Sequence, residues 1–299
     1  MSVTEQPADV DLPRSPRPPA AGVAPRDRAR RQSGVGRRPS KFWRIREDIP
    51  ARLRLSLMVA SLAIPLAVWT LLVVTNAVSD LFLPSPIEAF NAGRDLLSSG
   101  ALQNDVRWSV QRVAIGFGIA VLISVPLGLA MGTFKSMEAL FEPVIGFVRY
   151  MPAAAFTPLF LIWLGIDEPP KVVLIVVGTV FFNTLMTANV VWQVPTELIK
   201  VAFTLGASNF TVFTKVIFPH AVPGIIDAMR VNMAAAWNLI VIAELFAAEE
   251  GLGFRIVRSQ KFLQVDRIFA VLIVIGILGL ASDLALRTAR NRLAPWSQE

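Results

Sequence analysis

The segment TLGASNFTVFTKVIFPHAVPGI (204–225) lies between two long apolar runs and is itself too polar to cross a membrane. Its pattern predicts a helix end at Gly206, a second helix capped by Ser208, and a stop at Pro219 and Pro223. Glycine enters the left-handed backbone region without the steric cost that a Cβ imposes. The segment therefore predicts a helical hairpin with a fixed bend, held in water between two membrane spans.

The residues upstream complete this hairpin. Thr196 is expected to cap the first helix, whose apolar side is Leu198, Ile199, Ala202 and Leu205. The second helix repeats apolar residues at helical spacing, namely Phe210, Phe213, Val216 and Ile217. Because the bend is preset, residues 195–225 are predicted to move as a rigid lever that acts on the span at each end.

Composition places the hairpin in an all-α integral membrane protein. The 299 residues are 54% hydrophobic and 17% charged, with a mean hydropathy of +0.56, whereas a soluble domain carries about 25% charged residues. Several apolar runs reach the roughly 20 residues that a transmembrane helix needs. Six spans are predicted, at 55–77, 109–131, 143–164, 171–193, 226–247 and 267–288.

The residue inventory excludes most catalytic chemistry. The chain has no cysteine, one histidine (His220) and one tyrosine (Tyr150), so neither a thiolate or histidine metal site nor a Ser-His-Asp triad can be assembled. It also lacks a Walker lysine motif. We therefore expect no catalytic residue, no metal site and no cofactor in this chain.

The placement of positive charge predicts the topology. Of the 29 Lys and Arg residues, 13 precede residue 55, which favours a cytoplasmic N-terminus and contact with anionic lipid rather than with nucleic acid. Residues 1–38 are expected to form a disordered basic tail and residues 39–54 an interfacial helix. Six spans return the C-terminus to the cytoplasm. One predicted outer loop, 248–266, disagrees with the rule because it carries Arg255, Arg258 and Lys261.

Two further segments have distinct patterns. Ser85, Pro86 and Glu88 predict a capped helix on the outer surface, with an apolar face made by Ile87, Phe90, Leu96 and Leu97. The third span is interrupted by prolines, which membranes tolerate where protein or water satisfies the freed backbone groups. That span is expected to face the bundle interior, either lining a pathway or forming a structural kink. Its prolines are Pro143, Pro152 and Pro158.

The hairpin resembles the cytoplasmic EAA loop of bacterial ABC-importer permeases, whose pattern is Glu-Ala-Ala, three residues, Gly, nine residues, Ile-x-Leu-Pro. Ala202, Gly206 and Pro219 stand at matching positions, while Lys200 and Val201 replace the glutamate and the first alanine. VIFP (216–219) replaces the last four residues of the pattern. The resemblance implies that an ATPase subunit docks on Lys200, Val201, Ala202, Thr204, Leu205, Gly206, Ala207 and Pro219.

The resemblance extends from residue 83 to the C-terminus. FVRYMPAAAFTPLFLIWLGIDEPPK (147–171) and WNLIVIAELFAAEEGLGFRI (237–256) are similar to the branch that imports nitrate, taurine, alkanesulfonates or bicarbonate. It implies a type I (MetI-like) permease of the bacterial plasma membrane, working as a dimer, for a small anionic solute. An extracytoplasmic binding protein would deliver the solute. ATP and Mg would be bound by the partner ATPase.

Polar residues within the spans are the candidates for the solute pathway. They are Arg149, Pro152, Asn183, Thr187, Trp237, Asn238 and Glu244. Each also has a plainer interpretation: Arg149 reaches the cytosolic interface or pairs with Glu142, Glu244 is interfacial, and the other polar groups bond between helices. Two rival functions remain open on sequence grounds, an ion-coupled carrier or channel without an ATPase, and a membrane anchor without a pathway.

Overall fold

A computed structural model describes residues 48–79 and 81–297, and every regular element in these ranges is helical. By its internal contacts the chain divides into two units, Met1–Ser61 and Leu62–Glu299, and the division falls inside α1 (Ala51–Val74). The predicted tail at 1–38 and residues 39–47 of the predicted interfacial helix lie outside the described residues. Residues 51–54 are helical and belong to α1, which continues into the apolar run that follows; their place at the membrane surface stays a prediction.

The helices of the second unit follow one another with short connections. Five helices of the described chain, α1 among them, are long and apolar enough to cross a bilayer, and the bent pair α4–α5 makes a sixth when it is counted as one span. The elements after α1 are α2 (Pro86–Ser98), α3 (Ala101–Thr133), α4 (Lys135–Val148), η2 (Ala153–Phe156), α5 (Thr157–Leu164), α6 (Pro169–Trp192), α7 (Thr196–Thr204), α8 (Asn209–Val212), the π-helix η3 (Phe213–Ile217), α9 (Phe218–Ala247), α10 (Leu252–Lys261), α11 (Val265–Leu293) and η4 (Pro295–Ser297).

Helices α3 and α6 pack closely and run parallel. A Cβ added at Gly116 would lie 2.8 Å from the Cβ of Ile175, and one at Gly132 would lie 2.4 Å from the Cβ of Val191. Both contacts join residues 59 positions apart, so the register is constant along the interface. Small residues at every fourth position allow this approach, namely Gly116, Ala120, Ser124, Gly128 and Gly132. Because the two helices are parallel, the chain between them must cross back.

That return segment is α4 followed by α5, and it differs from the predicted third span. The two helices are bent by 79° at their break, and α4 begins at Lys135 rather than at 143. Lys135 pairs with Glu138 at 2.6 Å, so these charges lie in the first helical turn instead of a loop. Of the three prolines only Pro152 lies in the break, whereas Pro143 is inside α4 and Pro158 starts α5.

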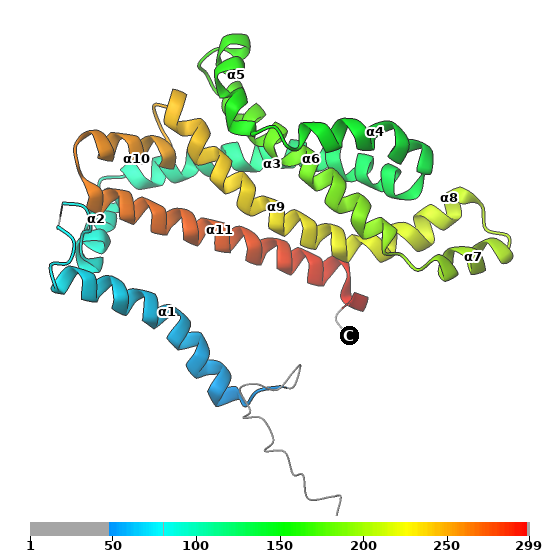
Figure 1. The fold of residues 1–299 in the computed structure, drawn as a ribbon, viewed down its shortest axis with the longest axis horizontal. Helices are drawn as coiled ribbons and strands as arrows, with labels where there is room; N and C mark the ends of the chain where they lie inside the picture. The colour runs from blue at the N-terminus through cyan, green and yellow to red at the C-terminus, as the bar shows by residue number, and fades with distance from the viewer. Residues whose placement is uncertain (1–47, 80, 298–299) are drawn as a thin grey trace, which may run out of the picture. The chain divides into compact units, whose positions relative to one another are not determined.

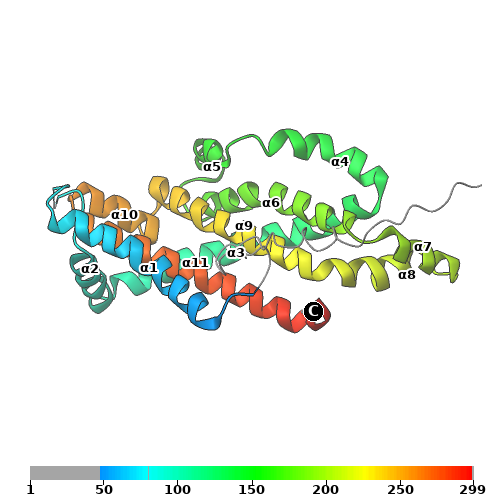
Figure 2. The same cartoon turned by 60° about the horizontal axis from the view of Figure 1, so that its bottom comes forward.

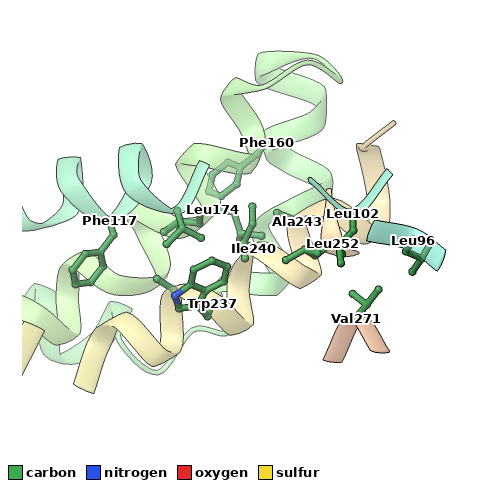
Figure 3. Close-up of a cluster of buried hydrophobic side chains, with 13 residues drawn as sticks. Leu96, Leu102, Phe117, Phe160, Leu174, Trp237, Ile240, Ala243, Leu252 and Val271 are labelled. Carbon is green, nitrogen blue, oxygen red and sulfur yellow. The ribbon is translucent and has the colours of Figure 1, made fainter. Parts of the chain in front are cut away.

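The main apolar core lies where α3, α6 and α9 meet. Phe117, Leu174 and Trp237 are buried together with Ile240 (Figure 3). Helix α2 closes one end of this core with the buried side chain of Leu96. The other three side chains of the predicted apolar face, Ile87 (72%), Phe90 and Leu97, are exposed. The predicted single apolar face of α2 is therefore wrong, because α11 occupies the Leu96 side. The capping box at Ser85 is present as predicted.

The two ends of the second unit are built differently. The hairpin α7–α8 and the C-terminus lie at one end, and α2 and α10 lie at the other (Figure 1). Helix α4 runs beside α6, on the side away from α11 (Figure 2). The hairpin predicted from the sequence thus lies at the opposite end of the long helices from α2 and α10.

Candidate functional site: a docking hairpin and an ionic clasp

The bend of the hairpin is closed by backbone hydrogen bonds around Gly206. Its φ is +82°, the left-handed conformation that was predicted. The Gly206 N–H donates to the Phe203 carbonyl at 2.9 Å, and the Ala207 N–H donates to the Ala202 carbonyl at 3.0 Å. This pair of bonds is the Schellman closure, which satisfies the last carbonyls of a helix. The bend is therefore closed by hydrogen bonds to the last turn of α7.

The second helix of the hairpin begins as predicted and ends differently. The Ser208 Oγ accepts from the Thr211 N–H at 3.3 Å and caps α8, whereas Thr196 caps nothing because α7 starts after Pro195. Pro219 and Pro223 do not stop the helix. The π-turn η3 lets the Phe218 N–H donate to the Phe213 carbonyl, and this change of hydrogen-bond register accommodates a proline, which has no N–H to donate.

Helices α8, η3 and α9 therefore form one continuous helix from Asn209 to Phe246. The second arm of the hairpin thus joins the fifth span without a break. The sequence predicted that Pro219 and Pro223 end the helix and redirect the chain, and this prediction is wrong because the helix runs through both prolines. The hairpin is an extension of the span.

The hairpin has one packed side and one uncovered side. Ile199, Ala202 and Ala207 pack against a buried cluster that includes Val212 and Ile217. Lys200 is exposed, and so are Thr204 and Pro195. The uncovered apolar side chains, called here the hairpin patch, are Leu198, Val201, Phe203, Leu205 and Phe210, with Leu205 81% and Phe210 75% exposed.

At the opposite end, a set of buried charges ties three spans together. The Arg112 guanidinium on α3 donates to both carboxylate oxygens of Glu168, at 2.6 and 2.7 Å, and to Glu244 Oε1 at 2.7 Å. Lys171 Nζ donates to Glu168 Oε1 at 2.9 Å. Arg112, Lys171 and Glu244 are each at most 5% exposed. Buried charges persist only when they are paired and hydrogen-bonded, and these are.

The loop between α9 and α10 is held by the same face of α3. Glu244 also accepts from Ser109 Oγ and from the Gly253 N–H, and Asp105 accepts from the Gly251 N–H at 3.0 Å and from Arg255 at 2.6 Å. A Cβ at Gly251 would lie 2.4 Å from the Glu244 carboxyl carbon, so only glycine allows this approach. We call the set Asp105, Ser109, Arg112, Glu168, Lys171, Glu244 and Arg255 the ionic clasp.

One member of the clasp is open to water. Asp105 neutralises Arg255 of the loop 248–266, whereas Arg258 and Lys261 of that loop are exposed, so the clasp accounts for one of its three positive charges. Glu168 precedes α6, and its side chain is 43% exposed. The guanidinium of Arg112 lowers the pKa of the Glu168 carboxyl to about 2, with Lys171 adding to the effect. Glu168 thus stays ionised throughout the physiological range.

A cavity of about 620 Å³ opens beside the clasp, and its charged lining residues are Arg112, Lys171, Asp167, Glu168, Glu249 and Glu250, with Trp108 beside them. The Arg112 guanidinium lies 5.4 Å from the centre of the Trp108 ring, within the range of a cation–π contact. The cavity thus offers two buried cationic side chains, and the carboxylate that both of them hold is the partly exposed one.

The residues predicted to line a pathway do not converge on one cavity. Trp237 and Asn238 border a groove of about 630 Å³ between α9 and α11, where the Trp237 indole N–H donates to Ser282 Oγ. Arg149 is exposed, stacks on Tyr150 and donates to its hydroxyl at 3.0 Å. Glu244 lies in the clasp, and Pro152 lies at the α4–α5 break.

Asn183 and Thr187 are buried on α6 against α3. Both polar side-chain atoms of Asn183 lack a hydrogen-bond partner, as does Ser124 Oγ. The constant register of α3 on α6 sets Ser124 opposite Asn183, in the middle of the glycine-lined interface. Thr133 Oγ1, at the end of α3, is a further buried side-chain oxygen without a partner among the described residues.

Sequence reasoning missed the clasp apart from Glu244. Arg112 lies inside the predicted span 109–131, and a charge at that depth is by itself a sign of a functional or paired group. Its partners lie 56 and 132 positions away in the sequence, so no local pattern connects them. Among the described residues, no cluster of three histidine or acidic side chains could hold a metal ion.

Comparison with known proteins places this architecture in a family. Residues 124–296 match the family described as binding-protein-dependent transport system inner membrane component. The chain belongs to this family. It is 37% identical to a probable ABC transporter permease protein of Brucella abortus (strain 2308), over 82% of this chain and 96% of that protein. It is 34% identical to the taurine transport system permease protein TauC of Escherichia coli (strain K12), over 84% and 93%.

Solved structures of ABC transporters share its fold. An inward-facing structure of the MetNI methionine ABC transporter matches with a TM-score of 0.56 over 64% of this chain and 95% of that chain, at 18% identity. The MetI-like, all-helical permease fold expected from the resemblance is confirmed. This chain is a multi-pass ABC importer permease, and a carrier or channel that works without an ATPase is not favoured.

Proposed function

We propose that this permease forms an import pathway with a second copy of itself, driven by ATP that a separate subunit binds with Mg and hydrolyses, and that the hairpin 195–225 receives that subunit. The observation that carries the proposal is the continuity of the hairpin with α9. The bend is closed by its own hydrogen bonds, and the hairpin joins the span without a break. A force applied to the hairpin would therefore move the span instead of bending the connection.

The hairpin patch supports docking at this position. Five large apolar side chains exposed on an element that extends into water need a cover, and the patch borders Lys200 and the Gly206 bend. Lys200 replaces the glutamate of the EAA pattern, so the docking groove of the ATPase is expected to carry an acidic residue at that point. Val201 and Leu205 would enter the groove, and Ala202 would stay against the permease.

The solute is proposed to be a small oxyanion delivered by an extracytoplasmic binding protein. Relatives include the taurine permease, a putative aliphatic sulfonates transport permease of Bacillus subtilis (strain 168), 31% identical over 78% of this chain, and the nitrate import permease of Synechocystis, 27% identical over 80%. Taurine and aliphatic sulfonates carry a sulfonate group, and nitrate is itself an oxyanion. The shared chemistry is a compact group of oxygens with a single negative charge.

The hairpin end is proposed to face the cytoplasm of a bacterial inner membrane. The hairpin and the C-terminal end of α11 lie at the same end of the second unit, and Arg287, Arg290 and Arg292 lie in the last turns of α11. The positive-inside rule supports a cytoplasmic location for this end. The clasp would face the outside, and basic residues before α1 would meet anionic lipid.

Docking is tested by co-purification from the native membrane. The tagged permease in mild detergent is expected to retain an ABC ATPase subunit, and Leu205→Asp is expected to reduce the retained ATPase by about tenfold, because burying one charge in an apolar contact costs more than about 1.4 kcal/mol. Thr288→Asp places the same charge on an exposed position of α11 at the same end. Loss of the ATPase in both variants, or in neither, would contradict docking at the hairpin patch.

A further inference from the structure

Helix α2 has three different faces around its circumference at about 3.6 residues per turn. The buried face, which packs towards α11, is made of Ala89, Ala92 and Leu96. A polar, exposed face is made of Glu88, Asn91, Asp95 and Ser98. The third face is apolar and exposed, and we call its side chains the α2 patch: Ile87, Phe90 and Leu97. Packing within the chain accounts for the first face, and water suits the second, so the α2 patch needs an apolar partner.

The start of α2 is held beside Trp69 of α1. The Trp69 indole N–H donates to the Pro84 carbonyl at 2.9 Å, and Trp69 is five residues from the end of α1 at Val74. At a rise of about 1.5 Å per residue, the start of α2 therefore lies about 7 Å inside the end of this helix. Because α1 is long and apolar enough to cross a bilayer, the chain returns into the membrane boundary before α2 begins.

The second half of α2 lies at the same level. A Cβ added at Gly93 would lie 3.5 Å from the Cβ of Ala270, and Ala270 is five residues from the start of α11 at Val265. The rings of Trp69 and Phe269 are 5.2 Å apart, which ties the two levels together. Helix α2 therefore runs along the membrane plane. Interfacial amphipathic helices bury their apolar face about 5–10 Å into the boundary between headgroups and acyl chains, and this depth agrees.

The first turn of α2 is suited to that depth because few of its backbone groups need water. Pro84 and Pro86 have no N–H to satisfy. The Ser85 N–H donates to Glu88 Oε2 at 2.7 Å, and the Glu88 N–H donates to Ser85 Oγ at 3.2 Å. The Pro84 carbonyl accepts from the Trp69 indole. Backbone groups at the edge of a membrane must find partners within the protein when water is scarce, and these do.

The charges of α2 do not favour an anionic lipid over a neutral one. Arg94 is exposed and lies at the same angular position as the α2 patch, where an arginine rests its stem on apolar groups while its charge reaches the headgroups. Glu88 and Asp95 lie on the polar face. With one positive and two negative charges on α2, the attraction to a lipid surface comes from apolar burial.

We propose that the α2 patch docks on the lipid bilayer at the end of the bundle opposite the hairpin, with Ile87, Phe90 and Leu97 in the boundary between headgroups and acyl chains. The patch continues the exposed apolar surface of the two spans beside it, on which Leu71 and Leu272 are exposed. Docking sets the depth of α1 and α11 through their contacts with α2. The proposal goes beyond the importer function and requires only that the chain spans a membrane.

The absence of cysteine from the sequence allows a direct test. One cysteine is introduced into the full-length permease, labelled with bimane, and the protein is reconstituted into phosphatidylcholine vesicles containing lipid brominated near the headgroup end of its acyl chains. The label on Phe90→Cys is expected to lose about half of its fluorescence or more, because it lies about 5–10 Å into the boundary. The matched control is Asn91→Cys, the next residue, which should lose less than about a tenth because the polar face stays in water.

A second pair of positions makes the result independent of any single variant. Ile87→Cys on the α2 patch should repeat the strong quenching, and Asp95→Cys on the polar face should repeat the weak one. Adding phosphatidylglycerol to the vesicles should leave both differences in place. Quenching that appears only with the anionic lipid would overturn docking by apolar burial.

Three further outcomes would also overturn the proposal. Equal quenching at positions 90 and 91 would show that α2 has no lipid-facing side. Quenching of the Phe90→Cys label by iodide in the water, and not by brominated lipid, would place the α2 patch in solvent. Protection from both quenchers would show that a second copy or another protein covers it. None of these results depends on retention of the ATPase, so the importer function is judged by the hairpin test alone.

Discussion

The two ends of the bundle differ in which side chains they bury and which they expose. At the clasp, charged side chains of α3, α9 and α10 are buried and paired, so that end is complete within one chain. At the hairpin, apolar side chains such as Leu205 and Phe210 are exposed although the backbone beneath them is fully organised. A rigid, uncovered apolar surface is suited to a partner, whereas buried charges that are paired hold together the helices that carry them. The difference sets apart an end suited to docking from an end held by its own charge pairs.

Removing a central charge of the clasp should have the largest effect. Glu244→Gln leaves Arg112 with one carboxylate instead of two, and breaking a buried pair costs about 3–5 kcal/mol. We expect a marked fall in the thermal midpoint of the purified permease. Glu249→Gln, at an exposed position of the loop that follows α9, is the matched control. A midpoint for Glu244→Gln equal to that of the control would show that the clasp does not hold this end together.

Distorting the bend should separate folding from coupling. Gly206→Val forces a β-branched residue to φ +82°, at a cost of about 1–3 kcal/mol that is paid locally in the hairpin. The spans should still insert, but ATP hydrolysis by the complex should no longer drive uptake in proteoliposomes. Gly206→Asn, which tolerates this backbone region better, should retain most of the coupling. Full coupling in the valine variant would mean that the bend is not part of the lever.

Acid should weaken the clasp only well below neutrality. The folded pKa of Glu168 lies below its ordinary value, so its contribution to stability is fully present above about pH 4.5 and is lost as the pH falls towards 2. Because its side chain is 43% exposed, solvent screening limits this contribution to about 1 kcal/mol. The difference in thermal midpoint between the unsubstituted chain and Glu168→Gln should be constant from pH 8 to 5 and shrink below that. A difference that disappears already at pH 6 would contradict the pairing with Arg112.

Arg149 should give the smallest effect on stability and a separate test of the pathway. Its side chain is exposed, stacks on Tyr150 and donates to its hydroxyl, so Arg149→Ala should change the free energy of unfolding by less than about 0.5 kcal/mol. As a pathway candidate near the α4–α5 break, it should reduce uptake more than it reduces assembly with the ATPase. Unchanged uptake in proteoliposomes would remove Arg149 from the pathway.

The hairpin could be predicted because its signals are local. Gly206 and Ser208 act on backbone groups within five residues of themselves, and these two predictions are confirmed. The prediction that Pro219 and Pro223 stop the helix is wrong for a related reason. Their cost depends on whether the preceding turn can change its hydrogen-bond register, and the π-turn at Phe213–Ile217 does so without any distinctive residue pattern.

Residue type and order determined that this chain is an all-helical, multi-span permease with a preset bend in its coupling segment, because hydropathy, glycine and helix caps act over a few residues at a time. Only the tertiary structure decided that Arg112 meets Glu168 and Glu244, that Ser124 lies opposite Asn183, and that the hairpin continues into α9 without a joint. The charged contacts among them join positions up to 132 residues apart. The free energy of a buried charge depends on which partner packing brings to it, and that partner is not encoded nearby in the sequence.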